Sequence, residues 1–141
     1  MTIDLDSLQP GTALPEMTRD VLQERINDYA EASGDFNPIH IDLEFARGTV
    51  MGGTIAHGML VLAYVSDYMA GHFGIEWING GKLGCRFKDP ARPGDTLTIS
   101  GTVSKLEPVD GGTSVSTEVT VANQDGQTVL ACETNVKVNQ K

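Results

Sequence analysis

The spacing of apolar residues divides the chain into a helical part and a strand part. Up to about residue 80, apolar side chains recur at three- and four-residue intervals, which is the helical period. From Lys82 onward they alternate with polar residues, as in strands that bury one face. No repeat, low-complexity segment or linker interrupts either part, so residues 1–141 are expected to form a single domain.

A first helix is expected after a turn at Pro10-Gly11 and a short strand over residues 12–14. Thr18 is its expected N-cap, with Asp20 in the first turn, where a negative charge is favourable. Gly34 suits the left-handed position that ends many helices, so the helix should stop there.

Two further helices are expected before residue 80. Asp42 should cap a short helix over Leu43–Arg47, and Gly48–Gly53 should form a mobile loop after it. The segment Gly58–Gly71 is apolar on nearly every side, which is typical of a buried helix.

Four long strands follow, each with its apolar residues on one face. The turns between them are expected at Arg92–Asp95, Asp110–Gly112 and Asp125-Gly126. Such an antiparallel meander and an apolar helix can cover each other if the sheet curves around the helix, which predicts an α+β fold. A single copy would leave edge strands and part of the helix uncovered, so a homodimer is expected.

The chain has 19 acidic and 10 basic residues, a formal charge of −9. Nucleic-acid binding relies on Lys and Arg to neutralise phosphates, so this balance argues against such a partner. No apolar run approaches the roughly 20 residues that a bilayer span needs. The first ten residues are acidic where an export signal would be basic, so a cytoplasmic protein is expected.

The two cysteines, Cys85 and Cys132, fall in strand-like runs, and without an export signal no disulfide is expected between them. The His and Cys residues lack the HxxxH and CxxC spacings of metal sites. Neither a metal nor a cofactor is therefore expected.

Residues with acid–base chemistry concentrate between the first and second long helices. Asp35, Asn37 and His40 supply a carboxylate, an amide and an imidazole, and Pro38 stiffens the turn between them. Asp35 and His40 are too far apart for one helical face, but they can converge if the chain folds back at Asn37-Pro38. Asp and Asn also favour turns, and an isolated His is often structural, so this spacing alone does not establish catalysis.

The buried helix opens on the sequence Ile55-Ala-His-Gly-Met59. A backbone N–H at a helix N-terminus stabilises negative charge that develops on an oxygen atom, and Gly58 exposes such an N–H. Gly58 would equally allow close packing of other backbone, and the neighbouring His57 is either structural or a substrate contact.

Together the two motifs resemble those of the MaoC-like dehydratases and (R)-specific enoyl-CoA hydratases. The pattern in that family is roughly S-G-D-x-N-P-x-H-x-D, a spacer, and H-G-M, and the order of elements is similar along almost the whole chain. The matching residues here are Ser33, Gly34, Asp35, Asn37, Pro38, His40, Asp42, His57, Gly58 and Met59. The resemblance implies the hot-dog fold and (R)-specific hydration of trans-2-enoyl-CoA, without a cofactor.

The resemblance also implies a role for each matching residue. Asp35 and His40 would hold a water between them, and the N–H of Gly58 would bind the thioester oxygen. Asn37 would orient the aspartate loop, and Ser66 on the buried helix would support the site. Which of Asp35 and His40 takes the first proton stays open, because a close pair titrates as a unit. Chain-length preference is also open, because Gly48–Gly53 lacks the bulky residue that relatives often carry there.

Four of the ten basic residues, Lys82, Arg86, Lys88 and Arg92, fall within eleven positions. They are either a solvated strand and turn or contacts to the phosphates of CoA. Arg86 and Lys88 share one strand face and are the expected CoA contacts. An acidic acyl carrier protein would be repelled by the acidic surface unless this patch offsets it, so a CoA thioester is favoured.

Three other functions remain as alternatives. The nearest is dehydration of a 3-hydroxyacyl chain on acyl carrier protein, in fatty-acid synthesis. Hot-dog thioesterases lack the paired aspartate–histidine loop, and non-catalytic acyl-CoA-binding subunits have lost the pair, so both of these are less favoured.

Overall fold

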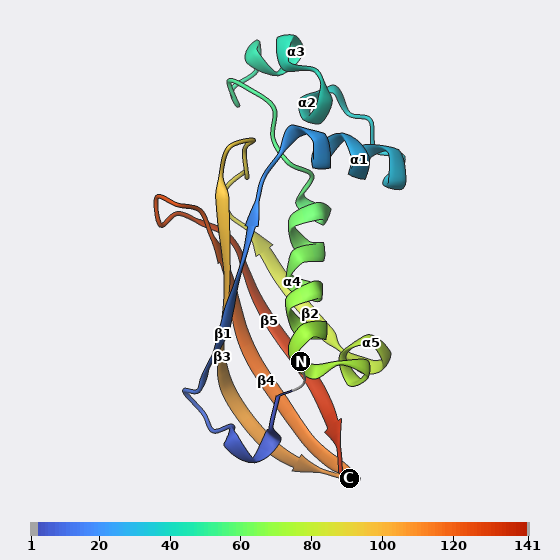
Figure 1. Ribbon diagram of the computed structural model, residues 1–141, viewed down its shortest axis with the longest axis vertical. Coiled ribbons are helices and arrows are strands. Elements are labelled where there is room, and N and C mark those ends of the chain that lie inside the picture. The colour runs from blue at the N-terminus through green and yellow to red at the C-terminus, as the bar shows by residue number, and fades with distance from the viewer. Residues whose placement is uncertain (1–2, 141) are drawn as a thin grey trace.

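The structure is a computed structural model that describes residues 3–140. A short 3₁₀ helix and one strand come first, the α-helices follow, and four strands end the described part of the chain (Figure 1). The elements in chain order are η1 (Leu5–Ser7), β1 (Ala13–Asp20), α1 (Gln23–Ser33), α2 (Pro38–Ile41), α3 (Leu43–Arg47), α4 (Gly58–Phe73), α5 (Ile75–Gly80), β2 (Lys82–Phe87), β3 (Thr96–Val109), β4 (Gly112–Ala122) and β5 (Thr128–Asn139).

The five strands form one antiparallel sheet in the order β1-β3-β4-β5-β2. The β3–β4–β5 meander is confirmed, with its turns where the sequence places them. The prediction that β2 belongs to this meander is wrong, because β2 pairs with β5 at the opposite edge from β1. Residues 88–95, which follow β2, contain Pro90 and Pro93 and are longer than hairpin loops of two to five residues, so the chain crosses to β3 instead.

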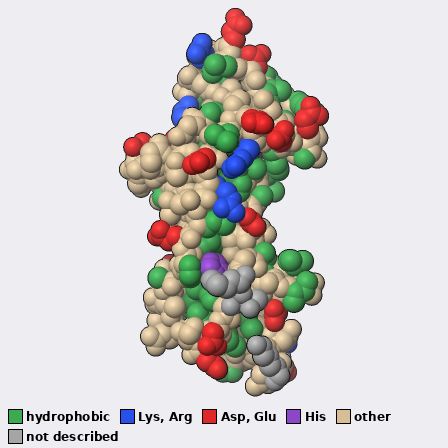
Figure 2. All heavy atoms as spheres, viewed as in Figure 1, with side chains coloured by type: hydrophobic (Ala, Val, Ile, Leu, Met, Phe, Trp, Pro, Cys, Tyr) green, Lys and Arg blue, Asp and Glu red, His purple; other side chains and the backbone are tan. Residues whose placement is uncertain are grey.

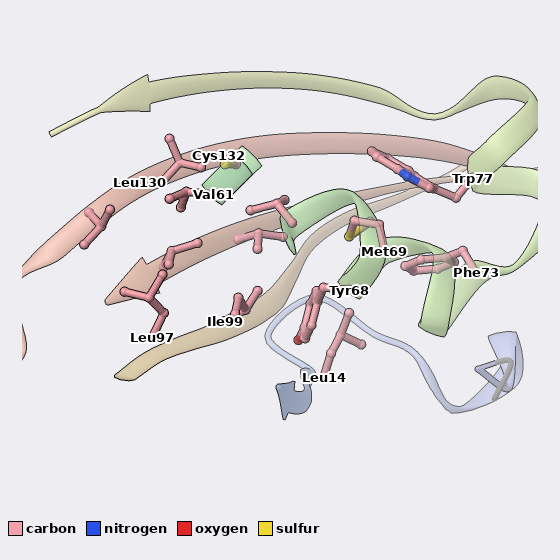
Figure 3. Packing of buried hydrophobic residues seen from close by; sticks show 14 of the residues in the cluster. Leu14, Val61, Tyr68, Met69, Phe73, Trp77, Leu97, Ile99, Leu130 and Cys132 are labelled. Atoms are coloured by element: carbon pink, nitrogen blue, oxygen red, sulfur yellow. The ribbon is translucent and has the colours of Figure 1, made fainter. Parts of the chain in front are cut away.

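Helix α4 lies across one face of the curved sheet and fills the core (Figures 1 and 3). Val65 and Met69 of α4 are fully buried against Leu97, Ile99 and other inward-facing strand residues. Burying a side chain of this size contributes about 1.5–3 kcal/mol, so helix and sheet hold each other in place. This confirms the α+β hot-dog arrangement of a single sheet around a buried helix.

The predicted start of the first helix is wrong. Thr18 lies in β1, opposite Thr98 of β3, and α1 begins at Gln23 after Leu22, which makes no side-chain cap. The strand extends past Pro15 because the pairing of β1 with β3 is irregular between Leu14 and Met17, where a residue without an N–H is tolerated. Pairing with a distant strand therefore outweighs the local capping preference of Thr18.

The end of α1 and the start of α3 are as predicted. Gly34 ends α1 with φ +76°, in the left-handed region, and its N–H donates to the carbonyl of Ala30. Asp42 caps α3, because its carboxylate accepts the N–H of Phe45 at 3.1 Å.

Cys85 and Cys132 are free thiols, although they lie directly opposite each other on β2 and β5. Burial raises the pKa of Cys132 to about 12, which keeps this thiol protonated and unreactive.

Helices α1 to α3 project beyond the end of the sheet as an overhang (residues 23–47), seen at the top of Figure 1. Its large apolar side chains Phe36, Ile41, Leu43 and Phe45 are exposed. Acidic side chains are scattered over the face of the molecule in Figure 2, consistent with the formal charge of −9. Within residues 3–140 no helix is long and apolar enough to span a membrane.

Tyr68 brings a poorly paired hydroxyl into the core. Its side chain is 2% exposed, and the hydroxyl lies beside the backbone of Gly101 without making a well-formed hydrogen bond among residues 3–140. Burial raises the pKa of Tyr68 from 10.0 to about 12.

Tyr68→Phe should therefore be at least as stable as the wild type at pH 7, because it removes a buried polar group that is poorly paired. Deprotonation is less favourable in the folded than in the unfolded state, so the wild type should lose stability as the pH rises from 10 toward 12. The phenylalanine variant has no such group, so urea melts should show the stability difference growing in its favour over this range. A variant much less stable than wild type at pH 7 would show that the hydroxyl does have a partner.

Candidate active site

The loop after α1 is organised by short-range hydrogen bonds around Asp35. The backbone N–H of Asp35 donates to the hydroxyl of Ser33 at 3.2 Å, and the Asp35 carboxylate accepts the N–H of Asn37 at 3.2 Å. The side chain of Asn37 in turn accepts the N–H of Ile39 at 3.2 Å and so caps α2. These three bonds fix the carboxylate relative to the helix that carries His40.

His40 faces Asp35 with a free nitrogen. Its Nδ1 lies 2.9 Å from the carbonyl oxygen of Ile55, which can only accept, so Nδ1 carries a proton and, in the neutral ring, Nε2 keeps its lone pair. This Nε2 is 4.0 Å from Oδ2 of Asp35. The gap is too long for a direct hydrogen bond, but one water bridging it would be within reach of both groups.

His57 connects this pair to the start of α4. It occupies the N-cap position of α4, is 2% exposed, and its Nε2 donates to the carbonyl of Asp35 at 2.9 Å. Its ring stacks on that of His40, with centroids 3.9 Å apart and planes at 25°, and meets the edge of Tyr29. One buried ring therefore contacts the Asp35 loop, the His40 helix and the α4 terminus.

The N-terminus of α4 is open to a ligand. No side chain caps it, and the N–H of Gly58, its first residue, has no acceptor within residues 3–140. Gly58 also borders a cavity of about 320 Å³, which we call the α4 cavity. Its apolar walls include Met51, Ile55, Val61, Phe87, Pro90 and Val129.

Gln23 is a site residue that the sequence did not suggest. Its side-chain amide donates to the carbonyl of His40 at 2.8 Å and accepts the hydroxyl of Thr54 at 2.7 Å. It thereby ties the His40 helix both to α1 and to the segment leading into α4. No local signal marks this residue, because its partners are 17 and 31 positions away.

Comparison with known proteins agrees with the geometry. The family model described as "MaoC like domain" matches residues 8–128. The chain belongs to the MaoC-like family.

Two curated relatives and one solved structure illustrate the similarity. An (R)-specific enoyl-CoA hydratase of Rhodospirillum rubrum is 32% identical over 86% of this chain and 83% of its own. A 3-hydroxyacyl-thioester dehydratase of Mycobacterium tuberculosis is 30% identical over 79% of this chain and 77% of its own. The structure of an R-hydratase from Pseudomonas aeruginosa superposes with a TM-score of 0.82 at 28% identity, covering 96% of this chain and 85% of that one.

This MaoC-like chain thus brings together Asp35, Asn37, His40, His57 and Gly58, as the resemblance implies, but not Ser66. The hydroxyl of Ser66 accepts the indole N–H of Trp77 at 3.0 Å. Ser66 lies eight residues beyond Gly58 on α4, about 12 Å along the helix axis. Within one copy it stabilises the contact between α4 and α5 and does not reach the Asp35–His40 pair.

The four cationic side chains that were expected to form one patch do not all lie on a single surface near the site. Arg86 points to the sheet face opposite α4, where it shares a hollow with Glu118 and Glu133. The guanidinium of Arg92 donates to the carbonyl of Met51 and so anchors the Gly48–Gly53 loop. Lys88 lines the same hollow as Arg86, as its strand spacing from Arg86 predicts, and it also lines the α4 cavity.

Asp35, His40 and His57 place one potential metal ligand atom each within 4.8 Å of one another. An imidazole binds a metal in the plane of its ring, and the planes of His40 and His57 are stacked and only 25° apart. Their lone pairs therefore do not converge on one ion. Moreover, Nε2 of His57 already donates to the Asp35 carbonyl, so the arrangement favours proton transfer over metal binding.

The two helix caps of the overhang allow a matched test. Asn37→Ala and Asp42→Ala each remove one N-cap, so each should lower the free energy of unfolding by about 1 kcal/mol in urea melts. Only Asn37→Ala also releases the helix that carries His40, so only this variant should lose most of its turnover. Equal turnover in the two variants would show that Asn37 has no part in orienting the pair.

Proposed function

We propose that the protein adds water to trans-2-enoyl-CoA to give (R)-3-hydroxyacyl-CoA, and catalyses the reverse dehydration. The observation that carries the proposal is the 4.0 Å gap between His40 Nε2 and Asp35 Oδ2, held beside an uncapped helix N-terminus. The (R) configuration is taken from the relative of that name in Rhodospirillum rubrum.

The chemistry needs three functions, and the site has a group for each. A base takes a proton from water as its oxygen attacks C3, an acid gives a proton to C2, and a donor stabilises the enolate oxygen in between. Asp35 and His40 supply the first two when they hold one proton between them, and either assignment of that proton balances the reaction. The N–H of Gly58 is the donor to the thioester oxygen.

We propose that the protein works as a homodimer with the sheets joined edge to edge and the α4 helices facing across the seam. Strands β1 and β2 are the open edges of the sheet. Near the site, Met59 is 58% exposed, and such a side chain gains free energy when a partner covers it.

Dehydration of a 3-hydroxyacyl thioester is the second candidate, since it runs the same steps in reverse. The Mycobacterium tuberculosis relative, named as a dehydratase, favours it. Acyl carrier protein is the alternative carrier in this case. Thioester hydrolysis is less favoured, because hot-dog thioesterases lack the paired aspartate–histidine loop that this chain carries.

Asp35→Ala and His40→Ala should each reduce the hydration of crotonyl-CoA by at least about 100-fold, since general acid–base groups contribute roughly 10²–10⁴. His72→Ala is the matched control, because His72 also bonds a backbone carbonyl, that of Pro15, but lies at the far end of α4. Near-normal turnover in either site variant would remove that residue from the mechanism.

The same assay separates the reaction classes. Loss of enone absorbance without free thiol indicates hydration, whereas release of free thiol indicates a thioesterase. If neither signal appears with any acyl chain of a panel, the proposed function is contradicted.

Preference for the carrier should depend on Lys88. We expect a higher kcat/KM for an enoyl-CoA than for the same chain on acyl carrier protein, because the protein is acidic and a second acidic protein is repelled. Lys88→Glu should raise KM for the CoA substrate more than it lowers kcat. Arg86→Glu, on the opposite face, should change KM little. A carrier-protein thioester used about tenfold better than the CoA thioester would promote the dehydratase of fatty-acid synthesis to first place.

A further inference from the structure

The aromatic ring of Phe87 lies directly against Gly58. Phe87 ends β2, and the alternation along that strand places its ring on the α4 side with Leu83 and Cys85. A Cβ atom built on Gly58 would lie 2.8 Å from Cε1 and 3.2 Å from Cδ1 of this ring. The ring edge therefore fills the space that a side chain at Gly58 would need, next to the open N–H.

Phe87 is also a wall of the α4 cavity. Although it contacts Gly58, it is 56% exposed, so much of the ring borders open space. The cavity volume of about 320 Å³ is at the small end of the roughly 300–1,000 Å³ typical of small-molecule sites. A ligand that enters from Gly58 meets this ring first.

The cavity and the Asp35–His40 pair border the same short segment, residues 55–58. The carbonyl of Ile55 accepts the ring N–H of His40, and Ile55, Ala56 and Gly58 line the cavity. A thioester whose oxygen is bound by Gly58 and whose C3 lies at the pair can therefore extend its remaining carbons into the cavity.

The lining favours an acyl chain over the pantetheine arm of CoA. Pantetheine carries two amides, and a buried amide without partners costs free energy. Lys88 and Asp89 are the charged residues on the cavity wall, and both are exposed, so Lys88 remains available to the CoA part of the substrate outside the cavity. The other lining residues are apolar. Apolar walls of this kind suit methylene groups, each of which contributes about 0.8 kcal/mol when buried.

We infer that Phe87 is a specificity-determining residue, because its ring stands on the wall of the α4 cavity beside Gly58 and takes up space that a longer enoyl chain would need. The ring should then favour shorter enoyl chains over longer ones. This inference rests on the proposed hydration of enoyl thioesters, and adds the class of acyl chain to it.

The test is kcat/KM over trans-2-enoyl-CoA substrates of four, six, eight and ten carbons. The activity of the wild type should fall as the chain lengthens from four to ten carbons. Phe87→Ala should raise the ratio of ten-carbon to four-carbon activity at least about tenfold, because the ring no longer takes up that space. Phe87→Leu should shift the ratio in the same direction by less.

Phe45→Ala is the matched control, because Phe45 is a similarly exposed phenylalanine on α3 that does not line the cavity. Its chain-length ratio should equal that of the wild type. Thermal melts should show all three variants folded, since both aromatic side chains are about half exposed.

The possible results separate the inference from the proposed function. A wild type that hydrates the ten-carbon chain as well as the four-carbon chain overturns the inference and leaves hydration standing. The inference is equally overturned if Phe87→Ala changes every chain by the same factor, which is the result expected if pantetheine occupies the cavity. If the wild type hydrates none of the four chains, the inference and the proposed function both fall.

Discussion

The buried ring of His57 is the contact on which the geometry of the site depends. The overhang that carries Asp35 and His40 projects beyond the sheet, whereas the N–H of Gly58 belongs to the helix in the core (Figure 1). His57 spans the two, through its hydrogen bond to the Asp35 carbonyl and its stacking on His40. Since it also precedes Gly58 directly, this side chain is the most direct link between the Asp35–His40 pair and the N–H of Gly58.

This contact has a cost. The Nδ1 atom of His57 is buried and finds no hydrogen-bond partner among residues 3–140, and an unsatisfied buried polar group costs about 1–3 kcal/mol. Such groups are uncommon in folded proteins and persist where the surrounding structure holds them in place. Here the segment before His57 is also held by the two hydrogen bonds of the Gln23 side chain and by the bond from the ring N–H of His40 to the carbonyl of Ile55.

The core determines where the open helix terminus stands. Helix α4 is apolar on nearly every side, and the inward faces of β3, β4 and β5 cover it (Figure 3). Its first turn emerges at the end of the sheet, where an N–H without an intrahelical partner meets the overhang. Fold and chemistry are therefore linked through one helix, which is buried on the side that faces the sheet and open at its first residue.

Local patterns predicted the parts of the structure that local forces decide. The alternation of β3 to β5, the apolar helix α4, the left-handed Gly34 and the cap at Asp42 all follow from nearby residues. The family motif alone predicts that Asp35, His40 and Gly58 belong to one catalytic site. The features that the sequence did not predict depend on contacts between residues far apart in the chain. The pairing of β1 with β3 overrides the capping preference of Thr18, and the pairing of β2 with β5 takes β2 out of the predicted meander. The contacts of Gln23 likewise reach across the fold.

The central claim is that a thioester oxygen binds at the start of α4 while C3 lies at the Asp35–His40 pair. The most direct measurement is a crystal structure of the protein with (R)-3-hydroxybutyryl-CoA. The thioester oxygen should accept the N–H of Gly58 at about 2.7–3.1 Å, and the 3-hydroxyl should lie between Asp35 Oδ2 and His40 Nε2. A product whose thioester oxygen lies away from Gly58, or whose hydroxyl contacts neither side chain, would contradict the account.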